Sequence, residues 1–300
     1  MANRFRTYAV LTLLVIGLVF AGIGCTGTEN GEEGAPAEDA YGDAPAAEAQ
    51  DIFIKGSDTV LPLAQAEAEE FMYANPEKTV TVTGGGSGVG IAAMIDGEVD
   101  IASASREMKD SEIENAEANG ISPMEHTIAY DGISVVVNPK NPVSELTFDQ
   151  LRGIYNGSIS NWKDVGGEAG PIAVISRDSS SGTYEYFKEE VLLEDEYRPD
   201  ALTQPTTGAI VSEVSQNPNA IGYIGVAYLD DSVKAVSLDS GDGFQYPSPE
   251  NIISGAYPLS RPLFFYTNGE PEGLTKEFID FVMSEEGQSL VLEVGYFPVK

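Results

Sequence analysis

The sequence of 300 residues contains one cysteine, one histidine and only 16 lysines and arginines, against 48 aspartates and glutamates. Because Cys25 is the single cysteine, no disulfide can form within the chain and a cysteine-rich metal centre is excluded. The single histidine, His126, excludes a histidine-cluster metal site and restricts serine–histidine catalysis to that one residue. We therefore expect neither a metal nor a cofactor.

The shortage of basic residues limits the partners of the chain. A formal net charge of −32 offers no basic surface for nucleic acid and disfavours electrostatic adsorption to anionic lipid. The length allows one large domain or two modest ones, and the hydrophobic fraction of 42% is typical of a globular protein.

The first 25 residues have the features of an export signal. Arg4 and Arg6 precede an uncharged, mostly apolar run over residues 8–24, which is shorter than the roughly 20 apolar residues of a usual bilayer span. The run ends in a segment that resembles a lipobox, the processing signal of lipoproteins: Ala21-Gly22-Ile23-Gly24-Cys25. Residues 1–25 are thus predicted to be a signal peptide, and the resemblance implies lipidation of Cys25. The alternative is an uncleaved anchor helix.

Residues 26–50 consist mainly of alanine, glycine, proline and acidic residues, with almost nothing to bury. This composition predicts a flexible acidic linker. With either form of N-terminus, the rest of the protein would lie outside the cell on a membrane tether.

The folded part begins near Asp51 and repeats one local design, a strand followed by a glycine- and serine-rich loop and a helix. The predicted strands are 51–55, 79–83 and 172–175, the loops 56–59, 84–88 and 177–183, and the helices 61–74, 89–95 and 184–191. Strands that alternate with helices predict an α/β fold with mainly parallel pairing.

Each loop places backbone N–H groups and hydroxyls at a helix N-terminus, where the helix dipole favours negative charge. Because serine and threonine are also ordinary helix caps, any single loop is explained equally well by capping alone. Three such loops, one of them carrying Arg177, indicate a small oxyanion held by neutral dipoles and one guanidinium. Nucleotide-binding and nucleophile-elbow motifs are missing from the sequence, which favours binding over turnover.

Further segments follow these loops in a specific order. They are Val99-Asp100-Ile101-Ala102 leading to Ala104-Ser105-Arg106, then Tyr130-Asp131-Gly132, Leu146-Thr147-Phe148, Ile154-Tyr155-Asn156-Gly157, Asn161-Trp162 and Ala220-Ile221-Gly222-Tyr223. Together with the three loops, this ordered set resembles the phosphate-binding protein of high-affinity phosphate ABC transporters, across about residues 51–300.

The resemblance implies a type II periplasmic-binding-protein architecture, in which two crossover strands join two α/β lobes around a central ligand cleft. Lobe I would comprise residues 51–130 and 258–300, and lobe II residues 131–257. Strands are predicted at 124–129 and 133–138, on either side of the first crossover.

The resemblance also implies the ligand residues. Thr59 and the backbone of Val60 match the first phosphate-contacting loop, Ser87 matches the second, and Ser105 with Arg106 forms a further segment. The arginine loop of the other lobe supplies Arg177, Ser181, Gly182 and Thr183.

One position departs from the family pattern. Many relatives have an aspartate where this chain has Arg106, and that aspartate accepts the proton of hydrogen phosphate. Without it, sulfate or another tetrahedral oxyanion would fit about as well. Asp58 is our candidate for the replacement acceptor; alternatively, it caps its helix or pairs with Arg106. We interpret Asp178 as orienting Arg177, and Asp131, at the crossover, as a residue that could reach the cleft.

The predicted function is a non-enzymatic, monomeric receptor on the outer face of the cytoplasmic membrane. It would capture inorganic phosphate and deliver it to the permease subunits of an ABC importer. The alternatives are a receptor for sulfate or another oxyanion, a secreted phosphatase that uses Ser87 or Ser181, and an adhesive protein that has lost the site.

Overall fold

A computed structural model of the protein describes residues 51–193 and 195–299. The predicted signal peptide, the linker and Cys25 lie outside these residues. Within the described ranges, none of the helices has the length and apolar character needed to cross a membrane.

The central sheet has the strand order β2-β1-β3-β11-β4-β8-β6-β7, and β9 also pairs with β4. Its strands are β1 (Asp51–Gly56), β2 (Thr79–Thr83), β3 (Ile101–Ala104), β4 (Pro123–Val137), β6 (Ala173–Arg177), β7 (Leu202–Gln204), β8 (Ala220–Gly225), β9 (Lys234–Ala235) and β11 (Ser260–Asn268). A separate pair consists of β5 (Glu145–Thr147) and β10 (Ser237–Asp239). Pairing toward both ends of the sheet is parallel, as predicted, whereas β4 and β11 run antiparallel to their neighbours at its centre.

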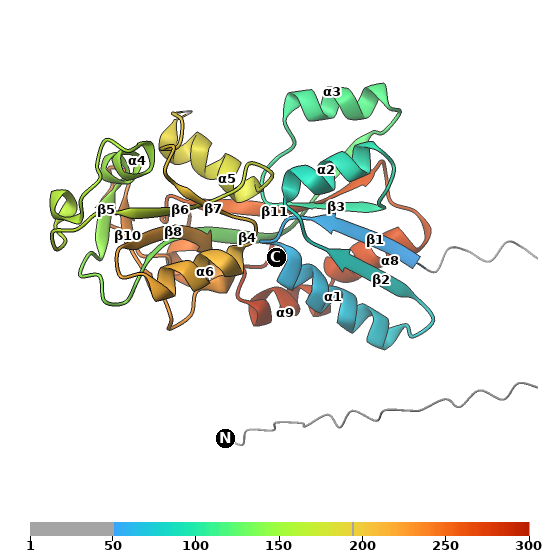
Figure 1. The fold of residues 1–300 in the computed structure, drawn as a ribbon. Coiled ribbons are helices and arrows are strands. Elements are labelled where there is room, and N and C mark those ends of the chain that lie inside the picture. The colour runs from blue at the N-terminus through green and yellow to red at the C-terminus, as the bar shows by residue number, and fades with distance from the viewer. Residues whose placement is uncertain (1–50, 194, 300) are drawn as a thin grey trace, which may run out of the picture. The chain divides into compact units, whose positions relative to one another are not determined.

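Helices cover the sheet on both sides (Figure 1). The α-helices are α1 (Leu61–Ala74), α2 (Ser87–Ile95), α3 (Asp110–Ala118), α4 (Phe148–Asn156), α5 (Gly182–Phe187), α6 (Thr207–Gln216), α7 (Pro249–Ile253), α8 (Gly273–Val282) and α9 (Glu285–Val294). A π-helical turn, η2 (Lys188–Leu192), continues α5, and short 3-10 turns lie at η1 (Trp162–Val165) and η3 (Val226–Tyr228).

Helix α1 illustrates how the sequence specifies these boundaries. Pro62 lies in its first turn, where a missing N–H leaves no hydrogen bond unmade. The helix ends at Ala74, two residues before Pro76. Leu63 and Phe71 recur on one face and are buried against the sheet and the C-terminal helices.

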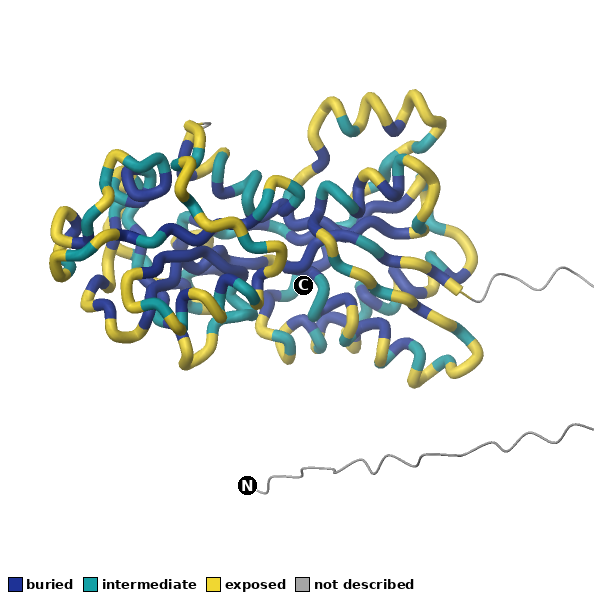
Figure 2. Tube along the Cα trace, in the orientation of Figure 1, coloured by how far each residue is buried: buried dark blue, intermediate teal, exposed yellow. Residues whose placement is uncertain are grey.

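The elements form two lobes on either side of the middle of β4 and β11 (Figure 1). Lobe I contains β1–β3, α1–α3, α8 and α9, and lobe II contains the elements between β4 and β11. Each lobe has its own hydrophobic core, with Ile54 and Phe278 in lobe I and Leu151 and Phe187 in lobe II. Figure 2 shows the buried strands beneath largely exposed helix faces, with α3 standing outward from lobe I.

The crossover consists of one long strand where the sequence predicted two. β4 continues through Tyr130, Asp131 and Gly132 because β11 pairs with it along this whole stretch. Arg261 lies directly opposite Asp131 in that register. Both crossover strands therefore run from one lobe into the other without a break at the point where the lobes meet.

Candidate functional site

The loops after β1, β2 and β6 lie next to one another where the two lobes meet. The backbone N–H of Gly86 donates to the carbonyl of Gly56 at 2.8 Å, and that of Gly88 donates to the carbonyl of Ser180, in the other lobe, at 3.0 Å. The structure brings together most of the residues expected at the site, and all of these are buried: Thr59, Val60, Ser87, Ser105, Ser181, Gly182 and Thr183.

Hydroxyl groups form a connected cluster on the lobe I side. The Ser57 hydroxyl donates to Ser105 Oγ at 3.1 Å, and the Ser105 backbone N–H donates to Ser87 Oγ at 3.1 Å. The backbone N–H groups of Thr59 and Val60 donate to Ser57 Oγ at 3.2 and 3.3 Å. Thr59 and Val60 lie at the N-terminus of α1 and Ser87 at that of α2, so small hydroxyls and two helix dipoles converge here.

The start of α5, in lobe II, touches this cluster directly. Thr183 Oγ1 lies 2.9 Å from Thr59 Oγ1. A Cβ atom added to Gly182 would stand 2.3 Å from Ser87 Oγ and 2.9 Å from Ser105 Oγ, so only glycine permits this approach. The two lobes are thus closed on each other at the site.

Arg177, at the end of β6, supplies the guanidinium on the lobe II side. Its Nη2 donates to Asp58 Oδ2 at 2.7 Å and to the Pro205 carbonyl at 3.0 Å, while Nη1 donates to Thr207 Oγ1 at 3.1 Å. The side chain is 2% exposed, and its Nε has no partner among the described residues. Tyr223 Oη accepts from the Arg177 backbone N–H at 3.3 Å and so anchors the strand end.

Two interpretations from the sequence need correction here. Asp58 pairs with Arg177 across the lobe interface and not with Arg106, because the closed lobes bring the β6 loop onto the N-terminus of α1. Asp178 does not orient Arg177. Its Oδ1 instead accepts from the backbone and the hydroxyl of Ser180 and shapes the loop.

The structure does not bring Arg106 into this cluster. Its Nη1 and Nη2 both donate at 2.8 Å to the carboxylate of Glu112, in α3, and Nη1 also donates to the Glu107 carbonyl. Burial alone would raise the pKa of Glu112, but the hydrogen bonds from Arg106 and from the Lys109 backbone hold that pKa below its ordinary value. Arg106 therefore anchors α3 to the loop after β3.

A second buried ion pair adjoins the cluster, and its arginine was not singled out from the sequence. Arg261 donates to Asp131 Oδ2 from Nε at 3.2 Å and from Nη2 at 3.0 Å. Burial raises the pKa of Asp131, although Arg261 acts in the opposite direction. A lone charge in the otherwise uncharged and mostly apolar segment 259–265 is the signal that could have identified Arg261.

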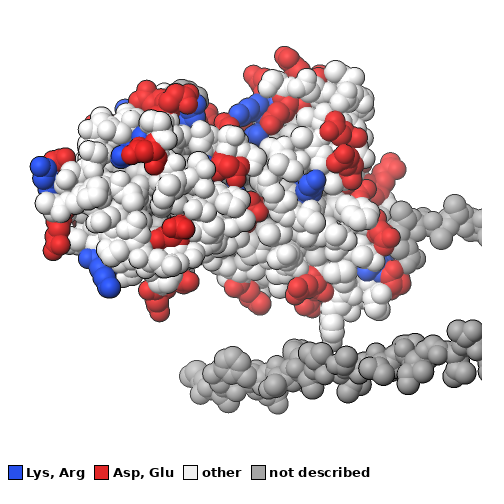
Figure 3. All heavy atoms as spheres, viewed as in Figure 1, with Lys and Arg blue, Asp and Glu red and all other residues white. Residues whose placement is uncertain are grey.

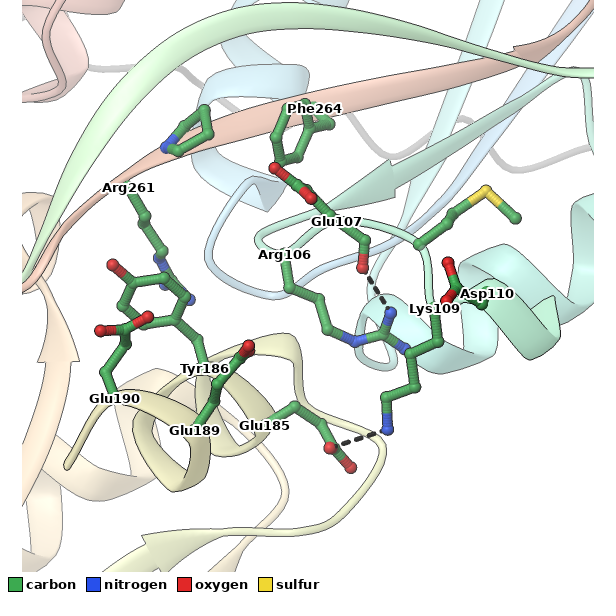
Figure 4. Close-up of a pocket in the computed structure, with 12 residues that line it drawn as sticks. Arg106, Glu107, Lys109, Asp110, Glu185, Tyr186, Glu189, Glu190, Arg261 and Phe264 are labelled. Carbon is green, nitrogen blue, oxygen red and sulfur yellow. Dashed lines mark hydrogen bonds and ion pairs between the residues drawn. The ribbon is translucent and has the colours of Figure 1, made fainter. Parts of the chain in front are cut away.

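Outside this cluster the lobes enclose a pocket of about 600 Å³. Figure 4 shows Arg106 and Lys109 on its lobe I side, Glu185 and Tyr186 on its lobe II side, and Arg261 at its edge. Lys109 Nζ lies 2.8 Å from Glu185 Oε2, so an ion pair joins the lobes across this pocket. Among the charged side chains on the face of the molecule in Figure 3, acidic ones are more widespread than basic ones. The arginines of the cluster are buried exceptions in an acidic protein.

Comparison with known proteins identifies the family. Residues 41–286 match the family model of the PBP superfamily domain. Over 251 residues the chain is 35% identical to the phosphate-binding protein PstS of Bacillus subtilis, an alignment that spans 83% of this chain and 80% of that protein. The chain belongs to the PstS family. The PstS of Pseudomonas aeruginosa is 34% identical over 263 residues, spanning 81% of each chain.

Solved structures related to the PstS family have the same fold. A transporter substrate-binding protein of Clostridium perfringens, solved with bound phosphate, is 38% identical with a TM-score of 0.76, covering 83% of this chain and 100% of that chain. An ABC-type phosphate transport receptor of Vibrio cholerae is 37% identical with a TM-score of 0.68, covering 82% and 99%. The predicted two-lobe α/β architecture of periplasmic binding proteins is confirmed.

Proposed function

We propose that this protein captures inorganic phosphate between its two lobes and delivers it, outside the cytoplasm, to the permease subunits of an ABC importer. The observation that supports this most strongly is the buried cluster at the lobe interface. In it, hydroxyls at the N-termini of α1 and α2 lie against Gly182 and Thr183 of the other lobe, and the Arg177 guanidinium of that lobe pairs with Asp58, just before α1. Such a site gives short-range donors to a small oxyanion, while the acidic charge on the protein surface is distant and screened. The Asp58 carboxylate lies within the site and pairs with Arg177. The family consists of binding proteins, and we expect no turnover of phosphate esters.

The proposed ligand contacts come from both lobes. Lobe I would contribute the Thr59 hydroxyl, the Val60 backbone N–H and the hydroxyls of Ser87 and Ser105. Lobe II would contribute Arg177, Ser181, the Gly182 backbone N–H and Thr183. Because each lobe holds part of the set, tight binding requires closure of one lobe on the other. Arg106 is left out of this set because Glu112 holds its guanidinium on α3 and, among the described residues, it makes no hydrogen bond to the cluster.

We further propose that Asp58 accepts the proton of hydrogen phosphate. Its Oδ2 accepts from Arg177 and its Oδ1 from the Gly85 N–H at 3.2 Å, so a carboxylate faces the place where the guanidinium would hold the ligand. Its side chain is 8% exposed. Hydrogen phosphate has a proton to share with this buried carboxylate, whereas sulfate has none and would be repelled by its negative charge.

Calorimetric titration tests both proposals. Ligand-stripped protein is titrated with phosphate at pH 6 and pH 8, with and without excess sulfate, and Asp58→Asn is measured beside it. We expect one-to-one binding that survives sulfate in the native protein and selectivity that is lost in the variant. Equal competition by sulfate in the native protein would indicate a general oxyanion receptor. If neither phosphate nor sulfate binds, the proposed function is refuted.

The tether, the oligomeric state and the exact lobe boundaries complete the proposal. We propose a monomer with lobe I at residues 51–130 and 258–300 and lobe II at 131–257, held at the membrane through lipid on Cys25. Membrane fractionation of Cys25→Ala tests the anchor, because a lipoprotein should lose its processed, membrane-bound form. An unchanged membrane-bound form would favour the uncleaved anchor helix.

A further inference from the structure

Arg261 contacts both lobes and the crossover at the same time. Within the crossover it holds Asp131, its cross-strand partner on β4. Toward lobe I its Nη1 donates to the Ser105 carbonyl at 2.8 Å, and toward lobe II its Nη2 donates to Thr183 Oγ1 at 2.9 Å. Its guanidinium also lies 5.5 Å from the ring centroid of Tyr186, in α5 (Figure 4).

These contacts depend on closure to different degrees. The Asp131 pair joins adjacent positions of two hydrogen-bonded strands, so it persists when the lobes move apart. The contacts to Ser105 and Thr183 involve the loop after β3 in lobe I and the first turn of α5 in lobe II, and separation of these two elements must break at least one of them. A guanidinium with its N–H groups in a fixed plane can hold both only in the closed arrangement.

The burial of Arg261 makes the loss of either contact costly. Its side chain is 1% exposed, and Asp131 is fully buried. An N–H that loses its acceptor in such surroundings must find water or another acceptor, so the closed state gains from satisfying it. Since Asp131 already neutralises the arginine, the gain comes from hydrogen bonds that Arg261 makes to the lobes and not from a net charge offered to the ligand.

We propose that Arg261 is a positioning residue that stabilises the closed state of the site and orients Thr183 toward the ligand. This inference rests on the proposed function of phosphate capture and deepens it. Arg261 would act after the anion has entered, by slowing the reopening of the lobes. It would leave the choice between phosphate and sulfate to the residues that touch the anion.

The test compares Arg261→Lys with the native protein in rapid-mixing phosphate binding and in small-angle scattering. Lysine keeps the charge beside Asp131 but cannot reach Ser105 and Thr183 together. We expect dissociation to become about 10- to 100-fold faster, as for one or two lost hydrogen bonds to a charged group. We expect an association rate and a phosphate-to-sulfate ratio within about twofold of native, and a smaller compaction on saturation with phosphate. Arg152→Lys, the same exchange at an arginine of α4, should change none of these.

Two results would overturn the inference. One is native dissociation kinetics in Arg261→Lys, and the other is a loss of anion selectivity, which would place Arg261 in direct contact with the ligand. If Arg261→Lys fails to fold, the double variant Asp131→Asn/Arg261→Gln removes both buried charges, and the same predictions apply to it. Binding of phosphate by the native protein is measured in the same series, so a failure of the proposed function is recognised separately.

Discussion

Gly182→Ala is the substitution whose effect follows most directly from the closed site. The added Cβ would lie 2.3 Å from Ser87 Oγ and 2.9 Å from both Ser87 Cβ and Ser105 Oγ. Ordinary contact begins at about 3.4 Å, so the two loops must stand roughly 1 Å farther apart. Because Ser87 and Gly182 belong to different lobes, this strain exists only when the lobes are closed.

The magnitude follows from the cost of overpacking. Inserting one methyl group into a filled site costs about 1–3 kcal/mol, which corresponds to a phosphate affinity about 5- to 150-fold weaker. The open state accommodates the methyl group, so the unfolding temperature without ligand should stay close to native. Calorimetric titration with phosphate and a thermal melt measure the two quantities on the same samples.

Gly208→Ala is the matched control. Gly208 is the second residue of α6, and a Cβ there would meet nothing within 4 Å. We expect unchanged affinity and a small gain in stability, of order 0.4–1 kcal/mol, since alanine restricts the unfolded chain. Native phosphate affinity in Gly182→Ala would refute the reasoning, because binding would then not require the lobe contact seen in the structure.

Three further predictions concern buried residues. Arg177→Met should abolish phosphate binding and lower the free energy of unfolding by about 3–5 kcal/mol, because it leaves the Asp58 carboxylate buried and unpaired; retained submicromolar affinity would contradict the proposed site. Burial raises the pKa of Glu67 well above its ordinary 4.5, and neither Oε has a partner among the described residues. Below pH 4.5 the carboxyl is neutral in both states. Above it, stability should fall by about 1.4 kcal/mol per pH unit up to the folded-state pKa. The stability of Glu67→Met should not fall in this way with rising pH, whereas Glu69→Met, changed at an exposed position of the same helix, should behave like the native protein. If the melting temperatures of the native protein and of Glu67→Met change with pH in the same way, Glu67 is not protonated in the folded state. Gly90→Ala should unfold at a clearly lower temperature, because its Cβ would lie 2.3 Å from the backbone oxygen of Lys55, which cannot give way; a native melting temperature would show that α2 can shift.

Local elements were predictable because their signals are local. The boundaries of α1 and β2 follow from Pro62, Pro76 and the alternating threonine and valine pattern, and the structure has both as predicted. The strand, loop and helix order around Ser87 and Gly182 was also recognisable, since glycine and hydroxyl residues at helix starts have a direct physical reason. The two helices begin at Ser87 and Gly182, two residues before the predicted starts at 89 and 184.

The partners of charged side chains were not predictable in the same way. Arg106 follows Ser105, a predicted site residue, yet its guanidinium donates hydrogen bonds to Glu112, six residues later in the chain. Asp58 forms an ion pair with Arg177, which is 119 residues away in the sequence. Asp131 pairs with Arg261 between two strands that only the fold brings side by side. An ion pair depends on distances of a few ångström, and a sequence gives no such distances between remote segments.

The sequence by itself determined the α/β elements, the family resemblance and the residue types suited to an oxyanion, because these depend on spacing and on backbone chemistry near each position. Only the tertiary structure decided which donors converge, which charged side chains pair with one another, and that Arg261 links the two lobes through the crossover. The physical reason is that hydrogen bonds and ion pairs in this site form between segments whose proximity results from sheet order and lobe closure.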